Sequence, residues 1–239
     1  MVLNDMWLRK DQTKVKSLDD NFYYISFNNY LFNTWKEILI LEIIPIFPTA
    51  LYRNKINRSL EKELSYIEND RIKLIKNKNN QFSKNTYILN EKQFFDLKKE
   101  IEYFLEDYFK VIINTNNNIK PYITQSWLNF TNTNESHHLH FHKNSYLSGV
   151  VYLNTQEDSI TFYKPDYYER IHLSINEGNI YNCASVKVPI QTNDILIFPS
   201  SLHHSVDVKK SKGIRISLSF NTFIKGNIGN EFNTTELIL

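Results

Sequence analysis

The residues of this chain with the clearest chemical potential are histidines and one arginine in its second half. His140 and His142 are separated by one residue, His204 follows 62 residues later, and Arg215 stands 11 residues beyond His204. Imidazole is the commonest protein ligand for iron, zinc and copper, and a guanidinium fork binds a carboxylate. Two rings spaced in this way lie on one face of a β-strand. The residues therefore predict a metal that works on, or with, a small carboxylic acid.

Further histidines surround the first pair. Four of the chain's 7 histidines lie between His137 and His142. His138, His140 and His142 share a strand parity, so a strand would turn them to one side. A histidine cluster on the surface is the alternative interpretation, and the apolar strands expected on either side argue against it.

The segment 213–221 alternates apolar and polar side chains. Its polar positions are Arg215, Ser217, Ser219 and Asn221, and isoleucine, leucine and phenylalanine stand between them. One interpretation is a half-buried strand whose polar face lies in water. The other is a strand whose polar face lines a pocket inside a barrel. The alternation alone fits both.

The elements that must position these residues are two helices followed by many short strands. Apolar residues at helical spacing predict helices at about 58–70 and 91–112. After Asn118 the chain changes to short alternating runs separated by turn residues, which is typical of a sandwich or barrel. The strands are expected at 121–130, 137–142, 147–154, 159–163, 171–175, 184–189, 194–198, 203–207 and 213–223.

Two segments upstream of the barrel have less regular patterns. A strand and turn are expected within 42–51, where Pro45 and Pro48 restrict the segment to a sheet edge. The Asn-rich stretch around Lys76 and Lys78 is interpreted as a solvated loop.

Composition restricts the class of protein. The chain has 239 residues, enough for one large domain or one core with an appendage, and its net charge of +2 gives no case for nucleic acid or an anionic membrane. Cys183 is the single cysteine, so no intramolecular disulfide can form. No secretory signal or membrane-spanning run is recognised, and we expect a cytoplasmic protein.

Three blocks of sequence stand in a fixed order in the second half of the chain. The blocks are His140-x-His142-x-Asn144-Ser145-x-Leu147-Ser148-Gly149-Val150-x-Tyr152, Phe198-Pro199-Ser200-x-Leu202-x-His204-Ser205-Val206, and Arg215-Ile216-Ser217-x-Ser219-Phe220-Asn221. Together they resemble a family of Fe(II)/2-oxoglutarate-dependent oxygenases found in bacteria and many marine bacteriophages. The resemblance covers roughly residues 42–225 and leaves 1–41 as an N-terminal extension.

The resemblance implies a mainly β fold, a double-stranded β-helix (a jelly-roll, cupin-like barrel) buttressed by two helices. The domain would span 42–239, with the barrel at about 121–225. The family's metal ligands match His140, His142 and His204, with no catalytic residue beyond the metal centre. The residues matched to the 2-oxoglutarate site are Arg215, for the far carboxylate, Ser217, Tyr152 and Asn129.

The implied activity is that of a dioxygenase. Fe(II) would be the metal, and 2-oxoglutarate and O₂ the co-substrates. The enzyme would hydroxylate an unidentified substrate and release succinate and CO₂. It would act in the cytoplasm of a bacterial or phage-infected host cell, and a homodimer stays open.

One departure from the family pattern leaves alternatives. The wider superfamily uses two histidines and a carboxylate, whereas the second position here is His142. Glu135 is the alternative carboxylate ligand, with His142 pointing elsewhere. Two other functions compete. One is a cupin-like three-histidine dioxygenase that uses no 2-oxoglutarate, and the other is a non-catalytic jelly-roll that serves as a structural or binding module.

Overall fold

The computed structural model describes residues 15–17, 23–25, 43–69, 72–164 and 173–239. The chain divides after Thr49. In the first unit, strands β1 (Val15–Ser17) and β2 (Tyr23–Ile25) form an antiparallel pair. The boundary expected after residue 41 lies outside the described residues.

The second unit, Ala50–Leu239, has helices near its start and antiparallel strands after them. Helix α1 spans Glu61–Asn69, and helix α2 spans Phe95–Tyr108 and continues as a π-helical turn over Phe109–Ile113. Short 3₁₀ turns occupy Ile88–Asn90, Lys92–Phe94 and Glu231–Asn233. The strands are β3 (Tyr52–Lys55), β4 (Leu74–Lys76), β5 (Gln81–Ser83), β6 (Ile119–Thr131), β7 (His137–His140), β8 (Leu147–Asn154), β9 (Asp158–Tyr163), β10 (Ser185–Ile190), β11 (Asp194–Pro199), β12 (His204–Val206), β13 (Arg215–Ile228) and β14 (Leu237–Ile238).

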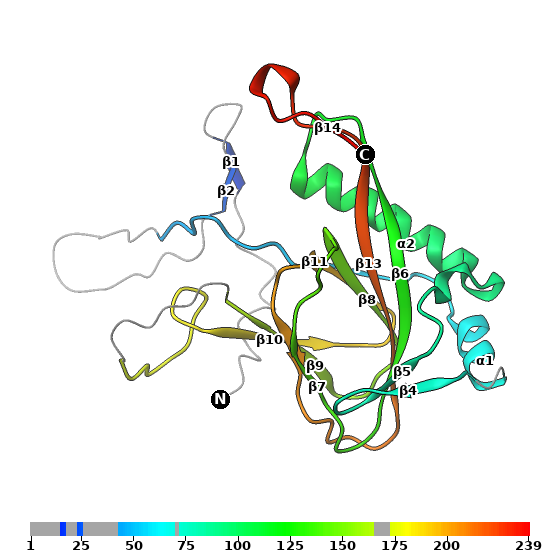
Figure 1. The fold of residues 1–239 in the computed structure, drawn as a ribbon. Helices are drawn as coiled ribbons and strands as arrows, with labels where there is room; N and C mark the ends of the chain where they lie inside the picture. Colours follow the sequence, from blue (N-terminus) through cyan, green and yellow to red (C-terminus); the bar gives the residue numbers. More distant parts are fainter. Residues whose placement is uncertain (1–14, 18–22, 26–42, 70–71, 165–172) are drawn as a thin grey trace. The chain divides into compact units, whose positions relative to one another are not determined.

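The strands form two sheets. The large sheet has the order β3-β11-β8-β13-β6-β5-β4, with β14 paired to the end of β13. The small sheet has the order β10-β9-β12-β7. From β6 to β13 the chain passes back and forth between the two sheets, and only the consecutive strands β9 and β10 stay in the same sheet. This is the arrangement of a double-stranded β-helix. Figure 1 shows α2 running alongside β6 and β13 of the large sheet. The predicted fold class is confirmed.

Strand β8 shows how the layers are held together. Successive side chains of a strand point to opposite faces. Val151 and Leu153 join the core under the helices, whereas Val150 and Tyr152 join a second core between the sheets. The strand is buried on both faces, which explains why its sequence is almost continuously apolar.

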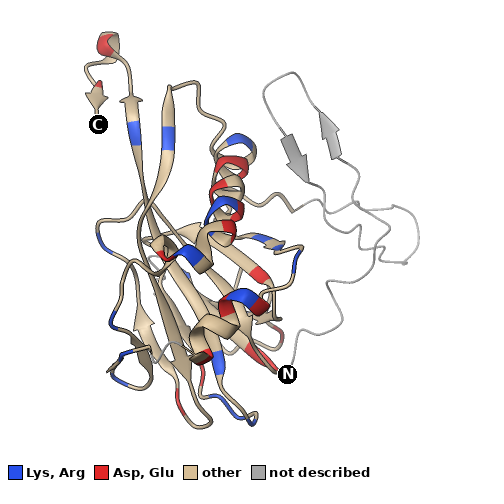
Figure 2. Cartoon of the chain, turned by 90° about the vertical axis from the view of Figure 1, so that its right-hand side faces the viewer, with Lys and Arg blue, Asp and Glu red and all other residues tan. Residues whose placement is uncertain are grey.

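Helix α2 covers the outer face of the large sheet. Its buried side chains recur at helical spacing and include Leu97, Ile101 and Phe104, which belong to the core under the helices. Its solvent face carries acidic and basic residues interspersed, without a block of one sign (Figure 2). Among the described residues, no helix combines the length and apolar character needed to cross a membrane.

Two expectations about elements were wrong. Residues 43–51 form no strand, and β3 begins only at Tyr52. Pro45 and Pro48 lack the N–H groups that a ladder needs. Residues 173–175 are irregular, and 171 and 172 lie outside the described residues. The stretch interpreted as a solvated loop is the loop of a hairpin between β4 and β5, with Lys78 and Asn79 exposed and a closing hydrogen bond from Asn77 N to Asn80 O. The two short strands beside this loop were not predicted.

Gly149 tests the packing at the centre of the large sheet. A Cβ atom at this position would overlap the ring of Phe220 and approach the carbonyl oxygen of Leu196 at 2.8 Å. Because the ring and the backbone are both fixed in the core, we expect Gly149→Ala to lower the free energy of unfolding by about 1–3 kcal/mol. Urea denaturation measures the effect. An alanine variant as stable as the wild type would contradict the packing described here. Gly178 is the control, since nothing lies near a Cβ atom there.

Candidate metal centre

Three histidines from separate segments meet at one place inside the barrel. His140 ends β7 and His204 begins β12, and the two are paired across these antiparallel strands. His142 follows β7, where its backbone N–H donates to Ser200 O at 2.9 Å. One ligand atom from each of the three histidines lies within 4.8 Å of the others. Among the described residues, this group is the one able to hold a metal ion.

The hydrogen bonds of these rings leave the same nitrogen free on each. Nδ1 of His140 lies 2.8 Å from His138 O, and Nδ1 of His204 lies 2.9 Å from Leu202 O. A carbonyl oxygen only accepts, so Nδ1 must be the protonated nitrogen in both rings. Nε2 is then left with its lone pair. This outer hydrogen bond is the one that orients metal-binding histidines and fixes their tautomer.

The third histidine is held by a side-chain network. Nδ1 of His142 lies 2.5 Å from Asn221 Oδ1 and 3.0 Å from Ser148 Oγ. Ser148 also donates to Asn221 Oδ1 at 2.9 Å and contacts Ser200 Oγ at 2.8 Å. With Asn221 accepting, His142 donates from Nδ1 and presents Nε2, as the other two rings do.

The three imidazoles are neutral around pH 7. Burial, together with the neighbouring histidines, lowers the pKa of His140 to about 4 and the pKa of His204 to about 3. Burial also lowers the pKa of His142, against a smaller opposing effect of its hydrogen bond with Asn221. A metal ion at this place would therefore not have to displace protons from the rings.

His203 and the alternative ligand Glu135 lie outside this group. The exposed ring of His203 packs on Phe141 with ring centroids 4.7 Å apart. Oε2 of Glu135 accepts hydrogen bonds from the backbone and side chain of Asn132 in its own turn. The structure thus leaves the alternative ligand Glu135 outside the histidine cluster, and His142 inside it.

Arg215 opens strand β13 and is buried, with 2% of its surface exposed. Its Nη2 donates to Thr131 Oγ1 at 3.0 Å, whereas Nε and Nη1 are buried without a hydrogen-bond partner. Burial lowers its pKa, although the guanidinium stays charged. Unpaired donors on a buried cation are costly, so this side chain is suited to an anion that would complete its bonds.

The other residues matched to the co-substrate site lie next to Arg215 in register. Ser217 pairs with Asn129 on β6 and with Tyr152 on β8, so the three side chains form a row across the sheet. All three are buried. Asn129 donates to Ser219 Oγ at 2.9 Å and leaves Oδ1 unpaired. The polar face of β13 is therefore turned into the barrel at Arg215 and Ser217, and not into water.

Aromatic side chains that the sequence did not indicate enclose the histidines. The rings of Phe198 and Phe162 lie 4.9 Å and 6.0 Å from that of His204, and Trp127 lies 5.7 Å from His142. Trp127 stands on the same face of β6 as Asn129, two residues away. That parity is the signal that would have placed it in the barrel.

A triad of neutral imidazoles inside a double-stranded β-helix defines the class, a metal-binding jelly-roll protein. A comparison with protein families narrows this class, because residues 125–221 match the family described as "Putative 2OG-Fe(II) oxygenase". The matched region contains the three histidines and Arg215. The family resemblance seen in the sequence is confirmed. A search of curated proteins by sequence finds no match.

Solved structures share the fold at low sequence identity. HygX from Streptomyces hygroscopicus with nickel and 2-oxoglutarate bound is 12% identical, with a TM-score of 0.52 over 73% of this chain and 82% of HygX. The non-heme alpha ketoglutarate dependent epimerase SnoN from nogalamycin biosynthesis is 9% identical, with a TM-score of 0.54 over 73% of this chain and 76% of SnoN. At these identities the likeness concerns the fold.

Asn221 provides a test of how the third histidine is held. Loss of an outer partner of a metal-binding histidine typically lowers metal affinity about 10- to 100-fold. We expect Asn221→Ala to lower the affinity for Mn(II) by this factor. An electron paramagnetic resonance titration, which measures the concentration of free Mn(II), gives the affinity. Asn227→Ala on the exposed end of β13 is the matched control. Equal affinities in the two variants would show that the bond to His142 does not support metal binding.

Proposed function

We propose that this protein is an Fe(II)- and 2-oxoglutarate-dependent dioxygenase that oxidises a second, unassigned substrate and releases succinate and CO₂. One observation carries the proposal. The same barrel interior contains three imidazoles with free Nε2 atoms and, on the adjoining sheet, a buried guanidinium with two unpaired donors. A metal and a carboxylate would satisfy these two sets of groups.

In this proposal His140, His142 and His204 hold the metal through Nε2. Nitrogen ligands of this kind suit Fe(II). Three neutral ligands leave the ion with its full double positive charge, where the usual carboxylate would reduce it by one. The 2-oxoglutarate dianion offsets that charge when it binds. The absence of a carboxylate therefore increases the dependence of the centre on its co-substrate.

Arg215 binds the far carboxylate of 2-oxoglutarate, and Ser217 and Tyr152 lie beside it. A guanidinium receives the two oxygens of one carboxylate through Nη1 and Nη2 or through Nε and Nη2, and Nη2 has a second N–H besides the one that it donates to Thr131. Burial raises the pKa of Tyr152, so its phenol stays protonated and able to donate. Asn129 is the fourth residue of the proposed 2-oxoglutarate site. The Ser219 hydroxyl can donate as well as accept, so the amide can turn its NH₂ group to the co-substrate.

When bound, Fe(II) with 2-oxoglutarate supplies the activation of O₂. The chain's own residues orient the co-substrate and shield it from water. Arg215 fixes one end of the co-substrate, the histidines fix the other, and Phe162 and Phe198 exclude water beside His204. Exclusion of water strengthens the electrostatic interactions inside the site. HygX binds 2-oxoglutarate together with nickel, and SnoN is alpha ketoglutarate dependent, which supports the proposal.

The direct test is formation of succinate from 2-oxoglutarate in the presence of Fe(II) and O₂ without a prime substrate. The proposal predicts slow turnover that stops when either Fe(II) or O₂ is withheld. A cupin-like dioxygenase would bind iron and form no succinate, and a structural module would take up no iron. Either result would refute the proposal.

The setting of the reaction belongs to the same proposal. We expect the protein to work in the cytoplasm of a bacterial or phage-infected cell, with O₂ as its second co-substrate and no membrane or nucleic acid as partner. Cys183 is a free thiol, consistent with a reducing compartment. A homodimer stays a prediction, which sedimentation analysis of the purified protein would test.

A further inference from the structure

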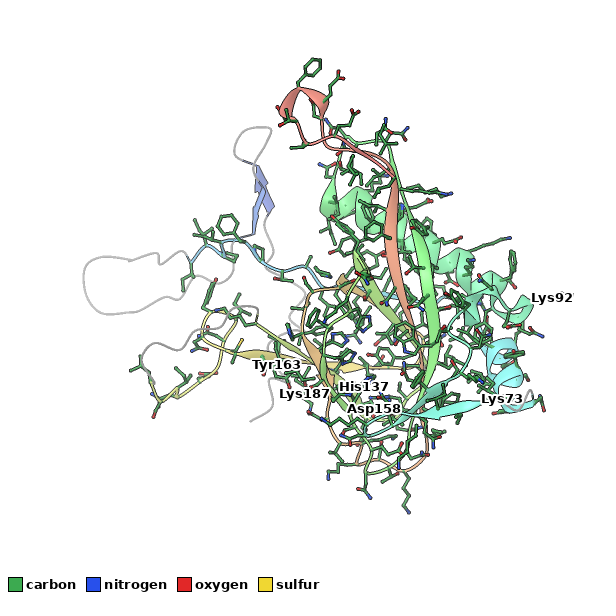
Figure 3. All side chains as sticks on the ribbon, viewed as in Figure 1. Lys73, Lys92, His137, Asp158, Tyr163 and Lys187 are labelled. Carbon is green, nitrogen blue, oxygen red and sulfur yellow. The ribbon has the colours of Figure 1, made fainter. Side chains whose placement is uncertain are left out.

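An irregularity in β7 brings another histidine into the barrel. On β12, His204 and Val206 are two residues apart, but their partners on β7, His140 and His137, are three residues apart. The extra residue on β7 is a β-bulge, which changes the direction of side chains on the bulged strand. His137 and His140 therefore share a face although strand alternation would separate them. Figure 3 labels His137 at the start of β7.

His137 lies directly against the metal centre. Its ring stacks on that of His140, with centroids 4.5 Å apart and an interplanar angle of 13°. The two rings are parallel, so they do not converge on one metal ion, and His137 is not part of the group that can hold one. Its position beside the centre calls for a different role.

The surroundings of His137 extend toward the carboxylate site. Burial, the neighbouring histidines and the charge of Arg215 together lower the pKa of His137 to about 2, and burial has the largest effect. His137 is therefore affected electrostatically by both His204 and Arg215, which hold the two ends of the co-substrate in the proposed function. Unlike the three ligand rings, it forms no hydrogen bond with any described residue.

We propose that His137 is a co-substrate-binding residue, whose imidazole beside the metal centre donates one N–H to 2-oxoglutarate. This inference rests on the proposed function. The stacking on His140 holds the ring next to the place where the metal-bound end of the co-substrate would lie. The bulge is the structural device that delivers the ring, since a regular strand would turn it away.

The test distinguishes the effect of losing the N–H donor from the effect of losing the ring. His137→Phe keeps a ring that can stack on His140 and removes the donor, and His137→Gln restores a donor without the ring. Calorimetry of 2-oxoglutarate binding to Mn(II)-loaded protein gives the co-substrate affinity, and electron paramagnetic resonance of free Mn(II) gives the metal affinity. Neither readout requires turnover. His203→Phe, at an exposed ring, is the control for replacing a histidine near the site.

The inference predicts that His137→Phe weakens 2-oxoglutarate binding by about tenfold or more, the usual effect of losing a hydrogen bond to a charged group. Mn(II) affinity should stay within about threefold of the wild type, and His137→Gln should recover most of the co-substrate affinity. Unchanged 2-oxoglutarate binding in His137→Phe would overturn the inference. A matching loss of Mn(II) affinity would overturn it too, since His137 would then act through the metal. A glutamine variant as weak as phenylalanine would refute the N–H donor.

Arg215→Met, measured in parallel, distinguishes this inference from the proposed function. If Arg215→Met weakens co-substrate binding and His137→Phe does not, only the role of His137 fails. If the wild type does not bind 2-oxoglutarate, or Arg215→Met binds it as tightly, the proposed pocket itself is wrong. The inference about His137 then fails with it.

Discussion

His204→Ala is expected to abolish metal binding, whereas His203→Ala leaves it unchanged. His204 is buried and presents Nε2 to the centre, and the neighbouring His203 is exposed and contacts Phe141. Loss of a direct ligand should exceed the 10- to 100-fold effect of losing an outer partner, so we expect a fall of more than about 100-fold in Fe(II) or Mn(II) affinity. Equilibrium dialysis followed by metal analysis measures it.

The two variants form a matched pair, because each removes one imidazole from the same segment. Circular dichroism of both should match the wild type, which would show that the barrel is intact. If His203→Ala lost the metal and His204→Ala kept it, the ligand assignment would be reversed. If neither variant lost it, the three rings would not be the metal site.

Arg215→Met should raise the concentration of 2-oxoglutarate needed for half-saturation by two to three orders of magnitude. Removing one partner of a buried charged pair costs about 2–5 kcal/mol, which corresponds to roughly 30-fold to several thousand-fold in affinity. Methionine fills much of the volume without the charge. Anaerobic titration of Fe(II)-loaded protein with 2-oxoglutarate gives the value.

Arg215→Met should weaken co-substrate binding without lowering the thermal stability of the free protein. The free protein carries two buried, unpaired guanidinium donors, which lower its stability. Binding of a carboxylate would pair these donors, and replacing the arginine removes them. We therefore expect the variant, without co-substrate, to melt at or above the temperature of the wild type. Arg215→Lys keeps the charge without the fork and should fall between the two in affinity. An unchanged affinity in Arg215→Met would remove Arg215 from the co-substrate site.

The sequence identified β13 correctly but could not say what its polar face meets. Arg215 and Ser217 alternate with apolar residues, and this pattern is the same for a face in water and a face in a barrel. The answer depends on β6 and β8, which flank β13 and place Asn129 and Tyr152 beside Ser217. Such pairings link residues far apart in the chain, which local periodicity does not encode.

Short and irregular elements could not be predicted from the sequence for a related reason. Strands β4 and β5 have three residues each, too few to show a period among the neighbouring asparagines. They exist because β5 pairs with β6. The inward position of His137 was missed because parity assumes a regular strand, and the bulge in β7 breaks that assumption.

The resemblance supplied residues that pattern alone did not, but it left one choice open. The family motif matched His140, His142 and His204, and Glu135 stayed an alternative to His142 because the wider superfamily uses a carboxylate. The structure brings His142 and His204 together with His140. The outer partners Asn221 and Ser148 stand within the same motifs, so they too were available from the sequence once the blocks were aligned.

The central claim is that three imidazoles and a guanidinium form one site for Fe(II) and 2-oxoglutarate. Anaerobic addition of Fe(II) and then 2-oxoglutarate, followed by visible absorption, tests metal, co-substrate and chelation together. The account predicts a charge-transfer band that needs both components, saturates at one 2-oxoglutarate per bound iron, and is absent from His204→Ala. Protein that binds iron tightly and gives no band with saturating 2-oxoglutarate would contradict it.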